Sequence, residues 1–310
     1  MNLKEKIIRY SKQIGIDLIG FTNSDCTALE ERLMLSKKLN LTSKFVSHDI
    51  KQRINPKLLM DNTKTIIVIG LAYPKDCQYL DHLKSNEVYF GNSSWGLDYH
   101  VVLRNKLLKL INYIKTIVSD LEYKIAIDTS PLDDRYLAYK AGLGFYGKHS
   151  LLINQKYGSY IFLGSMLTNL DIPIDKPLTI TCKNCDKCRE ACPTKAINDS
   201  GLLDSNKCLS YITQKKEDLT ADEIKLMNNC IYGCDICQRV CPYNEQVEYH
   251  HHLEFEPTGI EFINVDKYQS LSNKEFKQIY GHLAGAWRGS KVIERNIKIY
   301  KEKISLNKHL

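Results

Sequence analysis

The chain has 310 residues, of which 43% are hydrophobic and 25% charged, a composition that excludes wholesale disorder. No run approaches the roughly 18–20 apolar residues that a membrane-spanning helix needs. The N-terminal residues contain no apolar core of a secretory signal. We therefore expect a cytoplasmic chain with no membrane contact, built from two domains or from one large domain with an inserted module.

Apolar periodicity predicts alternating helices and strands in the first half of the chain. In chain order we expect a helix over 3–14, a strand over 17–22, a buried central strand over 65–73, a loop over 75–97 that is most flexible at 91–96, a helix capped by Asp98, a strand over 123–127, a helix over 133–140 and a strand over 159–168.

These elements predict an α/β sheet domain over residues 1–175, and the prolines at 173 and 177 mark its boundary. A second domain, over 176–248, contains most of the cysteines. A short helical and basic segment, over 249–310, completes the chain.

Eleven cysteines are unusual for a chain that is expected in a reducing compartment, and nine of them lie between Cys182 and Cys241. Cys26 and Cys77 are isolated and are interpreted as ordinary thiols. The first run is Cys182-x2-Cys185-x2-Cys188-x3-Cys192-Pro193, the bacterial ferredoxin signature. A zinc site would instead use two separated cysteine pairs, so the spacing favours iron–sulfur clusters.

The second run, Cys234-x2-Cys237-x3-Cys241-Pro242, lacks its first cysteine, because Ile231 stands at that position. Since the last cysteine of such a run binds the other cluster, Cys182, Cys185, Cys188 and Cys241 are predicted to hold one 4Fe–4S cluster. Cys192, Cys234 and Cys237 would hold the second, and either Cys208 or Cys230 would complete it. Two clusters indicate an electron wire, so an electron-accepting site is expected in the N-terminal domain.

Asp128, Asp133, Asp134 and Arg135 lie within eight residues, at a predicted strand end and helix start. One carboxylate would cap the helix, which accounts for Asp133. A second one beside Arg135 would act as a general acid if its pKa were raised. The sequence alone does not say which one.

The neighbouring glycine-rich run places Gly142, Gly144, Gly147 and Lys148 after a helix, so it is not a dinucleotide fingerprint. Its backbone would suit a phosphate or a flat cofactor, and the alternative is a helix C-cap with a tight turn.

Net charge is +7, and the basic excess is concentrated after Trp287. Such a patch fits a polyanion such as nucleic acid, and the alternative is a solvated terminal helix. The run His250-His251-His252 is expected to be a surface loop, because three consecutive histidines cannot all face one metal ion.

Several blocks, in this order and spacing, resemble the epoxyqueuosine reductase family from about residue 15 to 297. They are RINPKLLM, GLDYHVVL, DTSPLDDRYLAYKAGLGFYGKHSLLI, GSYIFLGSMLTNL, CKNCDKCREACPTKAI, KCLSYIT, YGCDICQRVCPYN and AWRGSKVIERN. The ferredoxin run alone would be common to many proteins, whereas the DTSPLDDR and GLGFYGKH blocks are specific.

The resemblance implies a cobalamin-dependent iron–sulfur reductase that removes the epoxide oxygen of epoxyqueuosine in the anticodon loop of tRNA. Its fold would be an α/β cobalamin-binding domain joined to a ferredoxin-like two-cluster module. It implies that Asp134 is the proton donor and that Cys208, rather than Cys230, is the eighth cluster ligand. The residues implied to line the cobalamin pocket are Asp98, Tyr99, His100, Asp128, Gly142, Gly144, Gly147 and Lys148.

With an RNA substrate, the basic tail is expected to contact tRNA through Arg288, Lys291, Arg295 and Lys298. An external low-potential electron donor is also implied, and we expect a monomer. His100 is not expected to bind cobalt, because Leu103 replaces the glycine of the Asp-x-His-x-x-Gly pattern. His149 departs from the family, which commonly has Asn there. The alternatives are a cobalamin-dependent reductive dehalogenase, which is usually exported, and a separate electron-transfer module.

Overall fold

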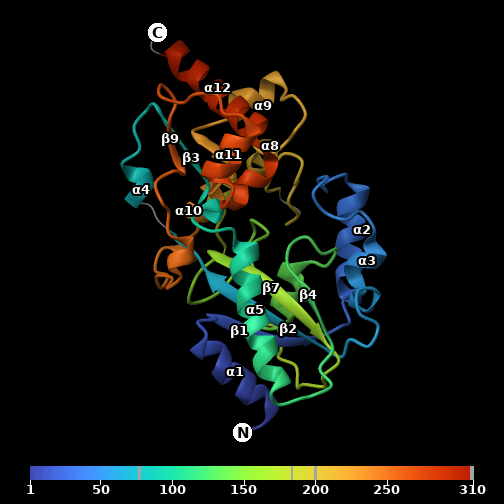
Figure 1. The fold of residues 1–310 in the computed structure, drawn as a ribbon. Coiled ribbons are helices and arrows are strands. Elements are labelled where there is room, and N and C mark those ends of the chain that lie inside the picture. Colours follow the sequence, from blue (N-terminus) through green and yellow to red (C-terminus); the bar gives the residue numbers. More distant parts are fainter. Residues whose placement is uncertain (76–77, 183, 199–200, 308–310) are drawn as a thin grey trace.

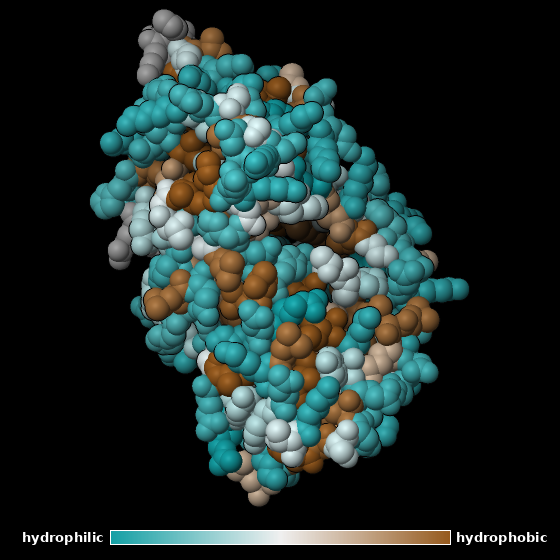
Figure 2. All heavy atoms as spheres, in the orientation of Figure 1, coloured by the Kyte–Doolittle hydropathy of each residue, from teal (hydrophilic) through white to brown (hydrophobic). Residues whose placement is uncertain are grey.

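A computed structural model describes residues 1–75, 78–182, 184–198 and 201–307 of the chain. Cys77 lies outside the described residues. The N-terminal sheet lies at one end of the molecule and the C-terminal helix α12 at the other (Figure 1). Figure 2 shows a hollow near the middle of this face, with apolar residues visible around it.

The first sheet has the strand order β1-β2-β7-β4, and its strands are β1 (Leu18–Asn23), β2 (Thr65–Ala72), β7 (Ile161–Thr168) and β4 (Tyr123–Ala126). All four strands were predicted from the sequence, and all three neighbouring pairs are antiparallel. The strand β2 is buried along its whole length, as its apolar run predicts.

Both faces of β2 are covered by helices, and this explains its unbroken apolar sequence. Ile67 and Ile69 pack in the core that contains residues of α1 (Leu3–Gln13) and α5 (Tyr99–Lys115). Ile66 and Val68 point to the opposite side, where α6 (Asp134–Lys140) packs. The sheet therefore holds the first residues of α5 and α6 in fixed positions.

A second sheet corrects the loop prediction for residues 75–97. The strand β3 (Glu87–Phe90) lies between β8 (Cys230–Tyr232), to which it is parallel, and β9 (Phe262–Asn264), to which it is antiparallel. The glycine- and serine-rich stretch after it is mostly buried instead of flexible. At Gly96, φ is +62°, and a Cβ atom would lie 2.3 Å from the carbonyl oxygen of Glu254.

The three predicted domain ranges remain a prediction. The strand β3, from the first range, forms a sheet with β8 and β9, which belong to the second and third ranges. The remaining helices and short strands are α2 (Glu30–Lys38), α3 (Ile50–Ile54), α4 (Gln78–Asp81), β5 (Phe145–Tyr146), β6 (Leu152–Ile153), α7 (Lys187–Ala191), α8 (Leu209–Ile212), α9 (Ala221–Leu226), α10 (Ile236–Arg239), α11 (Asn273–Tyr280) and α12 (Ser290–Asn307). Short 3-10 turns include η3 (Asn92–Ser94) and η6 (Ala284–Arg288).

The prediction of a surface loop at the three histidines is wrong for two of them. His250 and His252 are each only 4% exposed, whereas His251 is exposed. His252 Nε2 donates to Asp17 Oδ2 at 2.6 Å, and His250 Nε2 lies 3.0 Å from Glu256 Oε1. Asp17 satisfies the buried Nε2 of His252 and ties the segment to the first sheet, whereas His250 Nε2 lies near Glu256 without a hydrogen bond to it.

A groove of about 750 Å³ lies beside this histidine contact, and none of the predicted site residues lines it. Within the described parts of the chain, no helix is both long and apolar enough to cross a membrane.

Candidate functional site

A cluster of three carboxyl groups and one imidazole forms where α5 and α6 begin. Asp98 caps α5, as predicted, and its Oδ1 accepts both the backbone N–H of His100, at 2.9 Å, and the ring Nδ1–H, at 2.7 Å. The other ring nitrogen, Nε2, lies 3.4 Å from Asp128 Oδ2. The backbone N–H of Asp128 in turn donates to Asp134 Oδ2 at 2.9 Å.

The two carboxylates hold His100 in its charged form. Burial lowers the pKa of His100, but the hydrogen bonds and negative charges of Asp128 and Asp98 outweigh it and raise the pKa to about 9. Near neutral pH the ring is therefore an imidazolium with both nitrogens directed at carboxylates. An imidazolium has no lone pair for a metal. That His100 does not bind cobalt remains a prediction.

Asp134 has the properties of a general acid. Burial raises its pKa to about 8, and the negative charge of Asp128 contributes to the rise. Its Oδ1 atom is covered from solvent and has no hydrogen-bond partner among the described residues. Near neutral pH this carboxyl is protonated, so it has a proton to donate.

Asp133 has the structural role that the sequence allowed for it. Its side chain accepts the backbone N–H of Tyr136 as the N-cap of α6, and it also forms a 2.8 Å ion pair with Arg53. Arg135, on the other side of Asp134, donates to the carbonyl oxygen of Ser150 at 3.0 Å. Asp133 is therefore the capping residue, and Asp134 is the carboxyl that can act as a general acid.

The glycine-rich run is explained by packing. Gly142 has φ +73° just after α6, the helix C-cap that was the alternative interpretation. A Cβ at Gly144 would lie 2.5 Å from the carbonyl oxygen of Ile153, and one at Gly147 would lie 2.6 Å from the His149 ring. Lys148 pairs with Asp186 at 2.9 Å. Its side chain therefore faces the cysteine module, and the cofactor contacts predicted for these four residues remain a prediction.

Sequence reasoning did not assign a role to His149, Ser150 or Tyr232. His149 is buried, and burial together with the charge of Arg135 lowers its pKa to about 4, so its ring is neutral. Its Nε2 and the hydroxyl of Ser150 are buried without partners among the described residues, as are His100 Nε2 and Asp134 Oδ1. Orphaned polar atoms of this kind indicate a polar ligand. A cofactor with amide groups on its rim, such as cobalamin, fits this donor and acceptor set.

The thiols of the first predicted cluster set affect one another's pKa, and the set itself remains a prediction. Burial raises the pKa of Cys188, and the nearby thiols of Cys182 and Cys241 raise it further. Burial likewise raises the pKa of Cys241, with contributions from Cys182 and Cys185. The four thiols are therefore close neighbours, although Cys241 is separated from the other three by about fifty residues.

The thiols of the second predicted set, Cys208 included, affect one another's pKa in the same way, and this set also remains a prediction. Burial raises the pKa of Cys234 to about 12, and Cys208 and Cys192 contribute to the rise. The pKa of Cys237 is raised by burial and then by Cys234 and Cys208, and Cys188 of the first set also contributes. The two sets are therefore adjacent. Among the described residues, no three His, Cys, Asp or Glu side chains lie close enough together to hold one metal ion.

Cys230 is the less suitable eighth ligand. It is 1% exposed within β8, and its thiol donates to the carbonyl oxygen of Tyr232 at 3.3 Å. Cys208 instead stands at the N-terminal end of α8, and, in addition to burial, its charge raises the pKa of Cys234 and Cys237. Cys26 is buried, and burial raises its pKa to about 11, which makes it an unreactive thiol.

The basic tail is only partly free for RNA. Lys291 and Lys298 are exposed, and Lys298 pairs with Glu294 within its own helix. Arg295 donates to the carbonyl oxygens of Lys215 and Glu217, at 2.8 and 2.9 Å, so its first role is structural. The predicted tRNA contact of Arg295 is therefore supported less by the structure than those of the two lysines.

A buried carboxyl with a raised pKa, together with the cysteine pattern of a two-cluster ferredoxin, indicates an iron–sulfur oxidoreductase. One matching family model is described as "4Fe-4S double cluster binding domain", over residues 181–244. A second, over residues 53–129, is described as "Epoxyqueuosine reductase QueG, DUF1730". The epoxyqueuosine reductase of Bacillus cereus is 42% identical over 299 residues, which cover 95% of this chain and 78% of that protein. The chain therefore belongs to the epoxyqueuosine reductase family.

Further relatives agree. The epoxyqueuosine reductase of Escherichia coli is 34% identical over 260 residues, which cover 82% of this chain and 69% of that protein. A crystal structure of an epoxyqueuosine reductase with an epoxyqueuosine-modified tRNA stem loop superimposes with a TM-score of 0.92, at 40% identity, and covers 96% of this chain and 80% of that one. A Bacillus subtilis structure, with its catalytic loop swung out of the active site, gives 0.91 at 40% identity, with the same coverage. Membership of this family favours an epoxyqueuosine reductase over the two alternatives, a reductive dehalogenase and a separate electron-transfer module.

Proposed function

We propose that this chain reduces epoxyqueuosine to queuosine in the anticodon loop of tRNA. The observation that supports this most directly is Asp134, a buried carboxyl whose pKa is raised to about 8, in a chain that also has the cysteine pattern of a two-cluster ferredoxin. The charge of Arg135, its neighbour in sequence, reaches Cys208 and lowers the pKa of that thiol against the larger effect of burial. The chain therefore has a proton source at the start of α6 and an electron source in its cysteine module.

The reaction needs both of them. Removing the epoxide oxygen as water, with formation of a carbon–carbon double bond, consumes a pair of electrons and two protons. The clusters deliver electrons singly, and Asp134 donates a proton to the departing oxygen. General acid catalysis of this kind contributes roughly 10²–10⁴-fold to a rate.

Cobalamin is the cofactor proposed for this site. His149 and Ser150 would hold it, because each presents a buried polar atom that lacks a partner among the described residues. When bound, cobalamin supplies a low-valent cobalt centre, a strong nucleophile at a potential that iron–sulfur clusters can reach. The imidazolium of His100 directs its two N–H groups at Asp98 and Asp128, so it would not bind the metal.

The partners follow from the same assignment. The tRNA would be attracted by the exposed lysines of α12, Lys291 and Lys298. An external low-potential donor must reduce the clusters, and we propose that the protein acts as a monomer.

The test is anaerobic reconstitution with iron, sulfide and cobalamin, followed by incubation with a reductant and tRNA that contains epoxyqueuosine. Mass analysis of the digested tRNA should show queuosine replacing its epoxide. A reconstituted protein that binds both clusters but leaves the epoxide intact would contradict the proposal. A protein that also binds no cobalamin would instead be a separate electron-transfer module.

A further inference from the structure

An exposed aromatic cluster lies on the surface formed by three distant segments of the chain. The ring of Phe45 meets Tyr211 edge-on at 4.7 Å between centroids, and meets Trp287 edge-on at 5.7 Å. The guanidinium of Arg288 lies 4.3 Å from the Phe45 ring centroid and 3.7 Å from that of Trp287. We call these four residues the aromatic platform.

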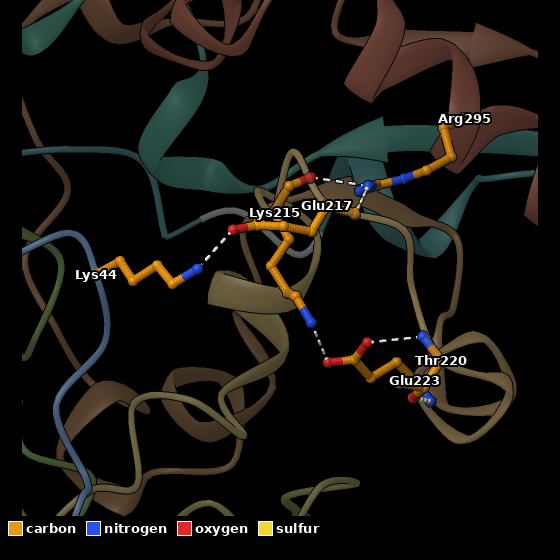
Figure 3. Close-up of polar contacts among 6 residues, drawn as sticks. All are labelled: Lys44, Lys215, Glu217, Thr220, Glu223 and Arg295. Carbon is orange, nitrogen blue, oxygen red and sulfur yellow. Dashed lines mark hydrogen bonds and ion pairs between the residues drawn. The ribbon is translucent and has the colours of Figure 1, made fainter.

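The platform is held in place by polar contacts around it. Lys44, next to Phe45, forms a 2.8 Å ion pair with Glu217, and Lys215 forms a 2.7 Å ion pair with Glu223 (Figure 3). Arg295 reaches from α12 to the backbone carbonyl oxygens of Lys215 and Glu217. The loop before α3, the segment after α8 and the start of α12 are thereby fixed to one another.

The platform borders the acidic site. The indole N–H of Trp287 donates to the hydroxyl of Tyr232 at 2.8 Å. The backbone also connects the two places, because the N–H of Asp98 donates to the carbonyl oxygen of His282 at 2.7 Å, just before the turn that contains Trp287.

Packing of the protein alone does not explain this arrangement. Trp287 is 58% exposed and Phe45 is 40% exposed, whereas the other tryptophan, Trp95, is 2% exposed in the core. The hydrogen bond to Tyr232 and the contact with Arg288 restrict the Trp287 side chain, which costs conformational entropy. Because the indole stays exposed, little burial of apolar surface offsets this cost. Exposed aromatic rings next to arginine are the means by which proteins bind unpaired RNA bases, which stack on them in a sequence-tolerant way.

We propose that Trp287, backed by Arg288 and Phe45, stacks against an unpaired base that flanks the modified nucleotide in the anticodon loop. Trp287 would then be a positioning residue: it holds the loop while the modified nucleotide enters the site at Asp134. This inference rests on the proposed function, because that function supplies the RNA loop.

The experiment uses reconstituted holoprotein and an epoxyqueuosine-containing anticodon stem-loop in which 2-aminopurine replaces each unpaired loop base in turn. In the wild type, stacking on the indole should quench the fluorescence at one loop position. Trp287→Ala should abolish that quenching and weaken stem-loop affinity roughly 5- to 150-fold, the range for loss of one stacked base. Trp287→Phe retains an aromatic face, so it should retain most of the affinity.

Tyr249→Ala is the matched control, because Tyr249 has a comparable exposed fraction, 57%, in a different part of the surface. It should leave affinity and quenching unchanged. Should Trp287→Ala lose its clusters, Trp287→Leu replaces it, since leucine keeps apolar contact with Phe45 but has no aromatic face. The leucine variant should lose quenching to the same extent.

Affinity and quenching that survive Trp287→Leu would overturn the platform. So would a Trp287→Phe variant that binds as weakly as Trp287→Leu, because stacking would then not be the cause. Binding is measured without turnover, and queuosine formation by the wild type is measured separately by mass analysis. A failure of the platform is therefore distinguished from a failure of the proposed function.

Discussion

The raised pKa of Asp134 leads to a specific pH dependence of turnover. Asp134 donates its proton only when protonated, and its pKa lies at about 8. About 90% of the molecules carry the proton at pH 7, but only about 10% do so at pH 9. The rate of epoxide reduction should therefore fall roughly tenfold between these values as the pH rises. Single-turnover measurements with pre-reduced protein isolate this step from the supply of electrons.

Two variants test the origin of this dependence. Asp134→Asn keeps the size of the side chain and an oxygen acceptor for the Asp128 N–H, but it removes the acid, so turnover should fall about 10²–10⁴-fold. Asp128→Asn removes the charge that helps to raise the pKa of Asp134, so the alkaline fall should move to lower pH. Asn is suitable at position 128, where φ is +47°, because it tolerates the left-handed region.

Unchanged turnover in Asp134→Asn would show that another group supplies the proton. A fall that stays at the same pH in Asp128→Asn would show that burial alone raises the pKa. Cluster absorbance should be the same in the wild type and both variants, since neither residue contacts the cysteine sets.

Three further predictions concern the clusters, the imidazole and the basic tail. Cys208→Ala should lose about half of the bound iron, because one of two clusters is lost, whereas Cys230→Ala should keep both by iron and sulfide analysis. In the cobalamin-loaded protein, His100→Ala should leave the cobalt ligand signature in electron paramagnetic resonance unchanged; an imidazole signature that disappears would contradict the prediction. Arg295→Ala should lower the free energy of unfolding by about 1–3 kcal/mol, because it removes two hydrogen bonds to the backbone. The exposed Lys298→Ala should change it by less than about 0.5 kcal/mol but reduce the salt dependence of tRNA binding, and equal effects of both variants on unfolding would contradict this distinction.

The cysteine spacing predicts most of the metal chemistry, because seven ligands lie in two short runs whose local geometry is set by the motif itself. The eighth was ambiguous. Cys230 is only four residues before Cys234, whereas Cys208 reaches its set through a contact between distant parts of the chain. The structure shows the thiol of Cys230 directed at the backbone of its own strand, a fact that spacing does not contain.

Predictions failed where distant partners determine the structure. The short strand β3 has only four residues, and its neighbours follow more than a hundred residues later, so local pattern could not distinguish it from a loop. The next residues have the composition of a flexible loop, but Asp235 accepts the backbone N–H of Asn92. His252 was misplaced for the same reason, since its partner Asp17 is 235 residues away.

The strand β3, which the sequence analysis did not predict, connects the acidic site to the cysteine module. After β3 the chain passes through η3 and enters α5, whose first residues form the acidic site. On its other side β3 pairs with β8, and two residues beyond β8 comes Cys234, a ligand of the second set. The backbone N–H groups of Tyr89 and Gly91 donate to Asn229 and Tyr232, at 2.8 and 2.7 Å. One strand pair therefore positions both the start of α5, with Asp98 and His100, and the loop that contains Cys234, so backbone hydrogen bonds connect this part of the acidic site to the cysteine module.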